Sequence, residues 1–163
     1  RSDGWMCEKY SDLPLDRFSF SCMQDGTYKA SGEEWKTNLM QAGDKISFQQ
    51  RHRISSGVFI ESSLNTVISD YTIYNGIGMG LIAQNCDTVT VNSMKVMPKE
   101  GRCFSINADA THFVHCRGLI HIKDSFFEGQ LDDALNVHGI YLSVFDKTEN
   151  SVILKFMHLI ANL

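Results

Sequence analysis

The chain has 163 residues, of which 43% are hydrophobic and 21% charged, a composition typical of a folded domain rather than of a disordered segment. Its 19 Asp and Glu outnumber its 15 Lys and Arg, so we expect neither a nucleic acid nor an anionic membrane as its partner. No run of about 18 uninterrupted apolar residues occurs, and a membrane-spanning helix is therefore not expected.

The cysteines contain no metal-binding motif. They number five and none forms a CxxC pair, so we expect buried free thiols and no zinc site. A disulfide between some of them is the alternative. The five residues are Cys7, Cys22, Cys86, Cys103 and Cys116.

Residues 1–50 have mixed features, which predict a cap or an inserted region. Turn signals occur at residues 25–26 and 43–44, each an Asp beside a Gly. A possible helix covers residues 33–39, and a short apolar run covers residues 46–48.

Residues 51–163 predict a different architecture. From Gly57 onward, short β-branched and aromatic runs alternate with Asn, Asp, Gly and Ser, which is typical of strands joined by tight turns. Three of these runs share a pattern in which apolar ends enclose a polar corner, and they start 23 and 31 residues apart. They cover residues 68–73, 91–96 and 122–127.

This repetition predicts an all-β fold, a right-handed parallel β-helix of the pectate-lyase type with eight residues inserted in one coil. We expect Val67, Val89 and Ile120, or their immediate neighbours, to share one interior stack. Because the last residues are apolar and lack an obvious cap, we expect the parallel β-helix of residues 51–163 to be truncated. An antiparallel sandwich or jelly roll with similar strand spacing is the alternative fold.

Two aspartates fall at matching positions of successive coils if the inserted residues lie in a loop at residues 97–102. Asp109 and Asp132 are then neighbours on one face, about 4.8 Å apart, the spacing of adjacent strands. The matching position of the preceding coil is Gly78, which leaves room for a ligand. Asp133 reaches the same cleft only at a corner or bulge, because consecutive residues of a strand point to opposite faces.

Carboxylates this close together favour acid–base chemistry. Their mutual repulsion allows one to hold a proton while another stays ionised at the same pH. Hydrolysis of a glycosidic bond needs this division, because an acid protonates the leaving oxygen while a carboxylate activates water or attacks the sugar carbon. We therefore predict Asp109, Asp132 and Asp133 as catalytic residues, although a single Asp in such a fold is usually a turn residue.

Asn107 and His138 are the predicted substrate-binding residues. Asn107 precedes Asp109 by two positions, and an imidazole at the position of His138 could donate to a sugar hydroxyl or orient a carboxylate. We expect no metal and no cofactor, because the other histidines considered lack acidic residues at ligand spacing and are interpreted as structural. These are His112, His115 and His121.

Three segments form a long motif: NADATHF at residues 107–113, CRG at 116–118 and FEGQLDDALNVHG at 127–139. Together they closely resemble glycoside hydrolase family 110, the exo-acting α-1,3-galactosidases, and the resemblance extends over roughly residues 43–141. Members of that family are several times longer than this chain.

The resemblance implies a right-handed parallel β-helix that removes terminal α-1,3-linked galactose from blood-group-B-type and linear glycans, with inversion and without a metal. It implies catalytic aspartates in the segments that match Asp109 and Asp132-Asp133. It also implies a secreted, periplasmic or cell-surface protein of bacterial glycan degradation, whose signal is not present in this chain.

Three other functions stay open. A polygalacturonase-like hydrolase fits only in part, because the Arg-Ile-Lys segment that binds a uronate is missing. A non-catalytic glycan-binding β-helix, such as an adhesin or a tail spike, would not need clustered acids. A polysaccharide lyase would need a calcium site and a basic catalytic residue, for which we find no candidate. The oligomeric state is left open.

Overall fold

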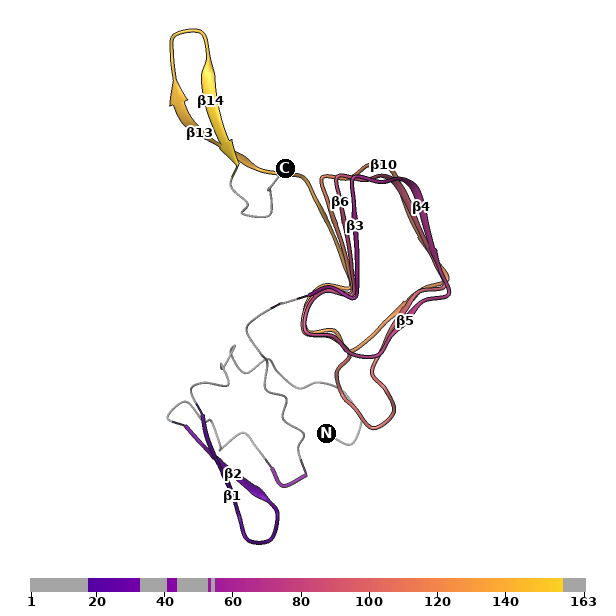
Figure 1. Cartoon of the computed structure of the whole chain (residues 1–163), viewed down its shortest axis with the longest axis vertical. Helices are drawn as coiled ribbons and strands as arrows, with labels where there is room; N and C mark the ends of the chain where they lie inside the picture. Colours follow the sequence, from indigo (N-terminus) through magenta and orange to yellow (C-terminus); the bar gives the residue numbers. More distant parts are fainter. Residues whose placement is uncertain (1–17, 33–40, 44–52, 54, 157–163) are drawn as a thin grey trace. The chain divides into compact units, whose positions relative to one another are not determined.

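The computed structural model describes residues 18–32, 41–43, 53 and 55–156 (Figure 1). The chain divides into two compact units, Arg1–His52 and Arg53–Leu163. The described residues contain strands and no helix, so none of them belongs to a helix that could cross a membrane. The helix predicted at residues 33–39 and the apolar run at 46–48 lie outside the described residues.

The first unit contains an antiparallel hairpin of β1 (Ser19–Cys22) and β2 (Tyr28–Ser31). The turn predicted at residues 25–26 is confirmed, because Gly26 has a φ of 82° and its N–H donates to the Met23 carbonyl. The backbone N–H and the hydroxyl of Thr27 both donate to the Asp25 carboxylate, and these hydrogen bonds lower the pKa of Asp25.

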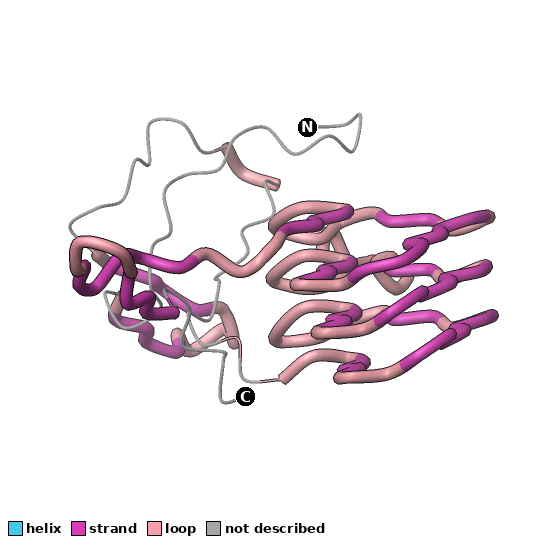
Figure 2. Tube along the Cα trace, turned by 90° about the horizontal axis from the view of Figure 1, so that it is seen from above, coloured by secondary structure: helices cyan, strands magenta, loops and turns pink. Residues whose placement is uncertain are grey.

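The second unit is built mainly of parallel sheets, and the chain visits three of them in a fixed order. The sheets have the strand orders β12-β9-β6-β3, β10-β7-β4 and β11-β8-β5. One repeat is therefore one strand in each sheet, and the repeats overlie one another in Figure 1 and stack in Figure 2. The strands are β3 (Val58–Glu61), β4 (Leu64–Ser69), β5 (Thr72–Ile73), β6 (Leu81–Gln84), β7 (Asp87–Asn92), β8 (Lys95–Val96), β9 (Thr111–Val114), β10 (Arg117–Lys123), β11 (Phe126–Phe127) and β12 (Leu135–His138).

The pairing of these strands confirms the repeats predicted from the sequence. Val91 pairs with Ile68 in the repeat before it and with Ile122 in the repeat after it. Val89 likewise pairs with Thr66 and Ile120, and together they form one interior stack. The third member is Thr66, the immediate neighbour of Val67, whose own side chain is 66% exposed. The predicted stack, which allowed for such neighbours, is confirmed.

Residues with positive φ occur at the same three places in each repeat: two lie at corners, directly after a strand, and one is the second residue of β4, β7 and β10. A left-handed residue reverses the chain direction abruptly, and away from Gly it is uncommon. Its recurrence at matched positions shows that each corner has one backbone solution that every repeat reuses. The three columns are Ser62, Asn85 and His115; Asn65, Thr88 and Gly118; and Asp70, Ser93 and Asp124.

The core lies between the three sheets. In the second repeat Leu81, Val89 and Val96 are fully buried, because repeats on both sides cover them. Ile60 in the first repeat and Ile122 in the third are only partly buried. The core is therefore most completely buried in the middle of the stack, where close packing holds β6 and β9 in place.

The final described strands differ from the prediction that residues 51–163 form coils. β13 (Leu142–Lys147) and β14 (Val152–Phe156) pair antiparallel as a hairpin. The Thr148 N–H donates to the Ser151 carbonyl, and the two hydroxyls lie 2.6 Å apart. This tight turn returns the chain to its own preceding strand, so the segment cannot add parallel strands to the stack.

Candidate active site

The pairing of β6, β9 and β12 decides which aspartates lie side by side. Thr111 pairs with Leu81 and with Leu135, so Asp109 matches Asp133, the residue two positions before Leu135. The backbone agrees, because the Ala110 N–H donates to the Asp133 carbonyl at 2.8 Å. The predicted match of Asp109 with Asp132 is therefore wrong by one residue.

The error arises because the inserted residues do not all lie in one loop. Met97 donates its N–H to Ile73, and Ile106 forms a bridge with Gly76, so the pairing offset grows between Met97 and Ile106 from 23 to 30 residues. The predicted loop at residues 97–102 lies in this interval. The last added residue belongs to a bulge in β10, which follows Asp109.

Gly118 forms this bulge between Arg117 and Ile120. It has a φ of 69°, and a Cβ there would lie 2.4 Å from the Asp87 carboxylate and 2.5 Å from the Thr88 hydroxyl. Glycine is therefore the residue that this position accepts without strain or collision.

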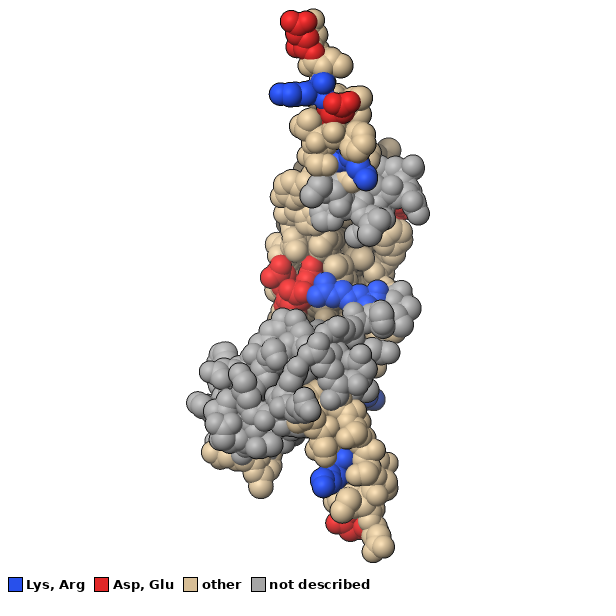
Figure 3. Space-filling model, turned by 90° about the vertical axis from the view of Figure 1, so that its left-hand side faces the viewer, with Lys and Arg blue, Asp and Glu red and all other residues tan. Residues whose placement is uncertain are grey.

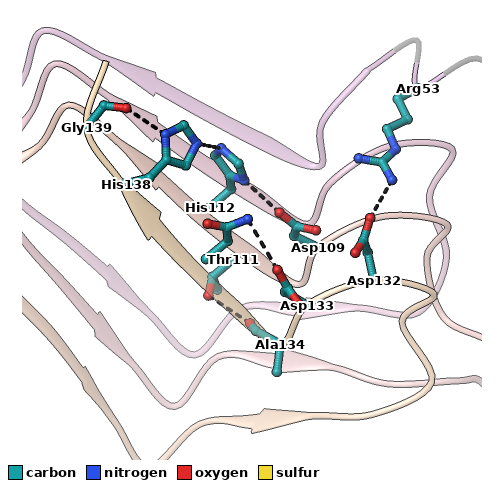
Figure 4. A network of polar contacts seen from close by, with 10 residues as sticks. Arg53, Asp109, Thr111, His112, Asp132, Asp133, Ala134, His138 and Gly139 are labelled. Carbon is teal, nitrogen blue, oxygen red and sulfur yellow. Dashed lines mark hydrogen bonds and ion pairs between the residues drawn. The ribbon is translucent and has the colours of Figure 1, made fainter. Parts of the chain in front are cut away.

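The three predicted catalytic aspartates come together in spite of this shift. One carboxylate oxygen of Asp109, one of Asp132 and one of Asp133 all lie within 4.8 Å of one another. Asp132 and Asp133 can both reach the cluster because they precede β12 and are not part of a regular strand. We expect two consecutive aspartates to share one site only at a corner or bulge, and Asp132 and Asp133 lie at such a corner (Figure 4).

Each carboxylate has a different partner. Asp109 is 2% exposed, and its Oδ2 lies 2.6 Å from Nδ1 of His112. Asp133 is exposed and accepts a hydrogen bond of 3.2 Å from the side-chain amide of Asn136. Both partners follow their aspartate by three residues, and they pair with each other across β9 and β12.

Asp132 has a cationic partner. A guanidinium N–H of Arg53 donates to Asp132 Oδ2 at 2.5 Å, and both side chains are well exposed. Acidic and basic side chains also lie next to each other on the face of the molecule drawn in Figure 3. An exposed pair of this kind adds little stability, and its hydrogen bond orients the Asp132 side chain toward Arg53.

His138 does not join the three carboxylates directly. Its Nε2 lies 3.0 Å from Nε2 of His112, and its Nδ1 lies 2.7 Å from the carbonyl oxygen of Gly139. Its ring also stacks on Tyr141, with centroids 6.5 Å apart. That His138 and Asn107 bind substrate stays a prediction.

From the sequence we interpret His112 as structural, and the structure places its imidazole against the Asp109 carboxylate. The signal was present in the spacing, because Asp109-x-x-His112 and Asp133-x-x-Asn136 place a hydrogen-bonding side chain three residues after each stacked aspartate. His115 and His121 are both exposed, and His115 occupies a corner with a φ of 52°.

The space expected beside Gly78 is filled by protein. A Cβ on Gly78 would lie 2.1 Å from the backbone oxygen of Ser55. The glycine therefore allows close packing of the preceding chain segment, the one that also carries Arg53, and does not leave room for a ligand.

The same three aspartates are the group, among the described residues, with the spacing of a metal site. We do not assign them as metal ligands, and the contacts observed for their side chains are those with His112, Asn136 and Arg53. The absence of a metal stays a prediction from the sequence.

Comparison with known proteins adds an independent observation. No family model matches the chain. An alpha-1,3-galactosidase B of Phocaeicola vulgatus is 32% identical over 160 residues, covering 93% of this chain and 26% of that protein. An alpha-1,3-galactosidase B of Parabacteroides distasonis is 37% identical over 128 residues, covering 76% of this chain and 21% of that protein. An alpha-1,3-galactosidase A of Shewanella woodyi is 32% identical over 121 residues, covering 72% of this chain and 20% of that protein.

The chain resembles one segment of the alpha-1,3-galactosidases. This confirms the family resemblance inferred from the motifs at residues 107–139. The chain spans about a quarter of the length of these curated relatives or less. The similarity to alpha-1,3-galactosidases and the cluster of aspartates were reached from different observations, and they concern the same chain segment.

Proposed function

We propose that this chain carries the catalytic carboxylates of a glycoside hydrolase that removes terminal α-1,3-linked galactose from glycans. The observation that carries the proposal is the convergence of Asp109, Asp132 and Asp133, from two adjacent repeats, to within 4.8 Å. Hydrolysis of a glycosidic bond uses one carboxyl group as acid and another as base or nucleophile, and three carboxyls with different partners can divide these tasks.

The different surroundings of the carboxylates support this division. Asp109 is buried beside an imidazole, Asp133 is exposed beside a neutral amide, and Asp132 pairs with a guanidinium. Carboxyl groups that differ in burial and in hydrogen-bond partner can take different parts in an acid–base reaction.

The proposal includes the finer features implied by the family resemblance. We propose that the stacked repeats form a right-handed parallel β-helix. We also propose inversion of the anomeric centre, on the resemblance alone, because inverting enzymes hold their carboxyl groups about 6.5–9.5 Å apart and oxygens within 4.8 Å are nearer the spacing of retaining enzymes. We further propose a secreted, periplasmic or cell-surface location, because glycans with terminal galactose are displayed outside cells.

The first test is the release of galactose from an α-1,3-digalactoside by the enzyme that contains this chain at its full natural length. Asp132→Asn should abolish most of the release, because asparagine keeps the shape of the side chain but can neither ionise nor deliver an acidic proton. Asp124→Asn is the matched control, since Asp124 is exposed at a corner with a φ of 51° that asparagine also tolerates.

Two results would contradict the proposal. One is the absence of any galactose release from α-1,3-galactosides by the folded parent enzyme, which would favour a glycan-binding function. The other is an Asp132→Asn variant that is as active as Asp124→Asn. The stereochemistry has its own test, since proton NMR should show β-galactose as the first product, and α-galactose would overturn inversion alone.

A further inference from the structure

We propose that His112 and His138 are positioning residues for Asp109, which they hold through a directional chain of hydrogen bonds that carries one proton shared with the carboxylate. The chain ends on the carbonyl oxygen of Gly139. This inference rests on the proposed function, because it assumes that Asp109 is a catalytic residue.

The geometry is a continuous set of three short contacts. Asp109 Oδ2 lies 2.6 Å from His112 Nδ1, His112 Nε2 lies 3.0 Å from His138 Nε2, and His138 Nδ1 lies 2.7 Å from the Gly139 oxygen. All three distances are within the range of hydrogen bonds (Figure 4). Asp109 and His112 are buried, so competition from water at their contact is limited.

The carbonyl of Gly139 fixes the direction of the chain. A carbonyl oxygen can only accept a hydrogen bond, so His138 Nδ1 must carry a proton and donate it. Two nitrogens 3.0 Å apart form a hydrogen bond only if one proton lies between them, so the contact between His138 and His112 holds a second proton. The contact between His112 and Asp109 needs a third.

Counting these protons shows that the chain holds one more than its neutral rings supply. A neutral imidazole carries one N–H, so two neutral histidines beside an ionised carboxylate provide two protons for three contacts. The third proton makes the set of Asp109, His112 and His138 electrically neutral overall instead of singly negative. It is therefore shared between the buried carboxylate and the imidazole of His112.

The stacked aspartate provides a comparison within the same molecule. Asp133 accepts a hydrogen bond from Asn136, whose amide donates but does not exchange a proton with a carboxylate at ordinary pH. Asn136 occupies the position of His112 in the next repeat. Asparagine is therefore an observed solution for holding an aspartate at this position without a shared proton.

The sharpest variant is accordingly His112→Asn, because the amide nitrogen of asparagine can reach the place of the imidazole Nδ1. We expect the protein to stay folded and kcat on the α-1,3-digalactoside to fall about 10–100-fold, because misplacing a reacting group by about 1 Å can cost about 10²-fold. We expect KM to change much less, because the loss concerns the reacting groups rather than binding.

The dependence of kcat/KM on pH gives a readout that a purely structural histidine would not move. His112→Asn removes one exchangeable proton, so at least one limb of the profile should shift. The charged and titratable groups around His112 are Asp109 and His138 in direct contact, then Asp132, Asp133, Arg53 and Tyr141. The control is His121→Asn, an exposed change on β10 that should leave kcat and the profile unchanged.

Nitrogen-15 NMR of the histidine rings tests the chain without using activity. His138 Nδ1 should be protonated at neutral pH, and its signal can be assigned with a His138→Gln variant. An unprotonated His138 Nδ1 would overturn the chain, and so would a His112→Asn enzyme with the kcat and pH profile of the parent. If the parent releases no galactose, the proposed function fails, whereas the NMR result still decides the chain.

Discussion

Asp109 and Asp133 occupy the same backbone position in successive repeats, yet their surroundings differ. Asp109 is buried and contacts an imidazole, whereas Asp133 is exposed and contacts an amide. The backbone of the stack therefore determines where a carboxylate lies, whereas its burial and the residue three positions later determine its surroundings. Two side chains in equivalent places can in this way acquire different chemical roles.

The largest predicted loss of activity follows from replacing either of these two carboxylates by a neutral amide. Asp109→Asn and Asp133→Asn should each lower kcat by about 10²–10⁴-fold, which is the contribution of a positioned acid or base. Both variants should stay folded, which circular dichroism can check, and initial rates of galactose release measure the loss. If only one of them loses activity, the two stacked aspartates do not share the chemistry.

A second prediction compares the repeats that carry these aspartates. Phe113 and Val137 pair with each other across β9 and β12, but Phe113 is 0% and Val137 is 54% exposed. Phe113→Ala should lower the free energy of unfolding by about 3–5 kcal/mol, because it leaves a cavity in the core. Val137→Ala should cost below about 1 kcal/mol. Denaturant titration measures both, and equal costs would show that the two repeats are equally buried.

A third prediction concerns the partner of Asp133. Asn136→Ala removes the amide that donates to Asp133 and should lower kcat by about tenfold, the lower end of the range for losing an orienting contact. The loss should be smaller than that of His112→Asn, because no shared proton is removed. A larger loss for Asn136→Ala in the same kinetic assay would reverse the order of importance of the two partners.

The smallest effect is expected at a thiol of the repeat that contains Asp109. Burial raises the pKa of Cys116, so less of it is thiolate at a given pH than in an exposed cysteine. Because the thiolate is the reactive form, Cys116 should be alkylated by iodoacetamide at pH 8 more slowly than the exposed Cys22. The difference should narrow as the pH rises. Mass spectrometry of the modified peptides measures the rates, and equal rates would show that Cys116 is open to solvent.

Much of the parallel stack could be predicted from the sequence, because apolar residues recur at the same positions of each repeat. The match of Ile68, Val91 and Ile122 needs no knowledge of side-chain contacts, since the same corner recurs in each repeat. The position of the long loop could also be predicted, because Pro98 and Gly101 interrupt the strand pattern there.

The one-residue shift of the aspartates could not be predicted in the same way. A bulge at Gly118 changes the count of residues without changing the apolar pattern around it, so counting alone assigns Asp132 to a place that Asp133 occupies. The hairpin from Leu142 to Phe156 was missed for a related reason, since short apolar strands have the same composition in parallel and antiparallel pairs.

The columns of left-handed residues also bear on how such a chain can diversify. At two of these positions, directly after a strand, the matched residues of each repeat share one backbone geometry, whereas the third, at Gly118, already admits one added residue in β10. The described segments that lead into β6 and β9 have no such column, and the long loop between Met97 and Ile106 lies on this side, shortly before Asp109. Most of the variation in repeat length is thus accommodated in the chain shortly before Asp109, while the strands on either side of the loop keep their pairing with the preceding repeat.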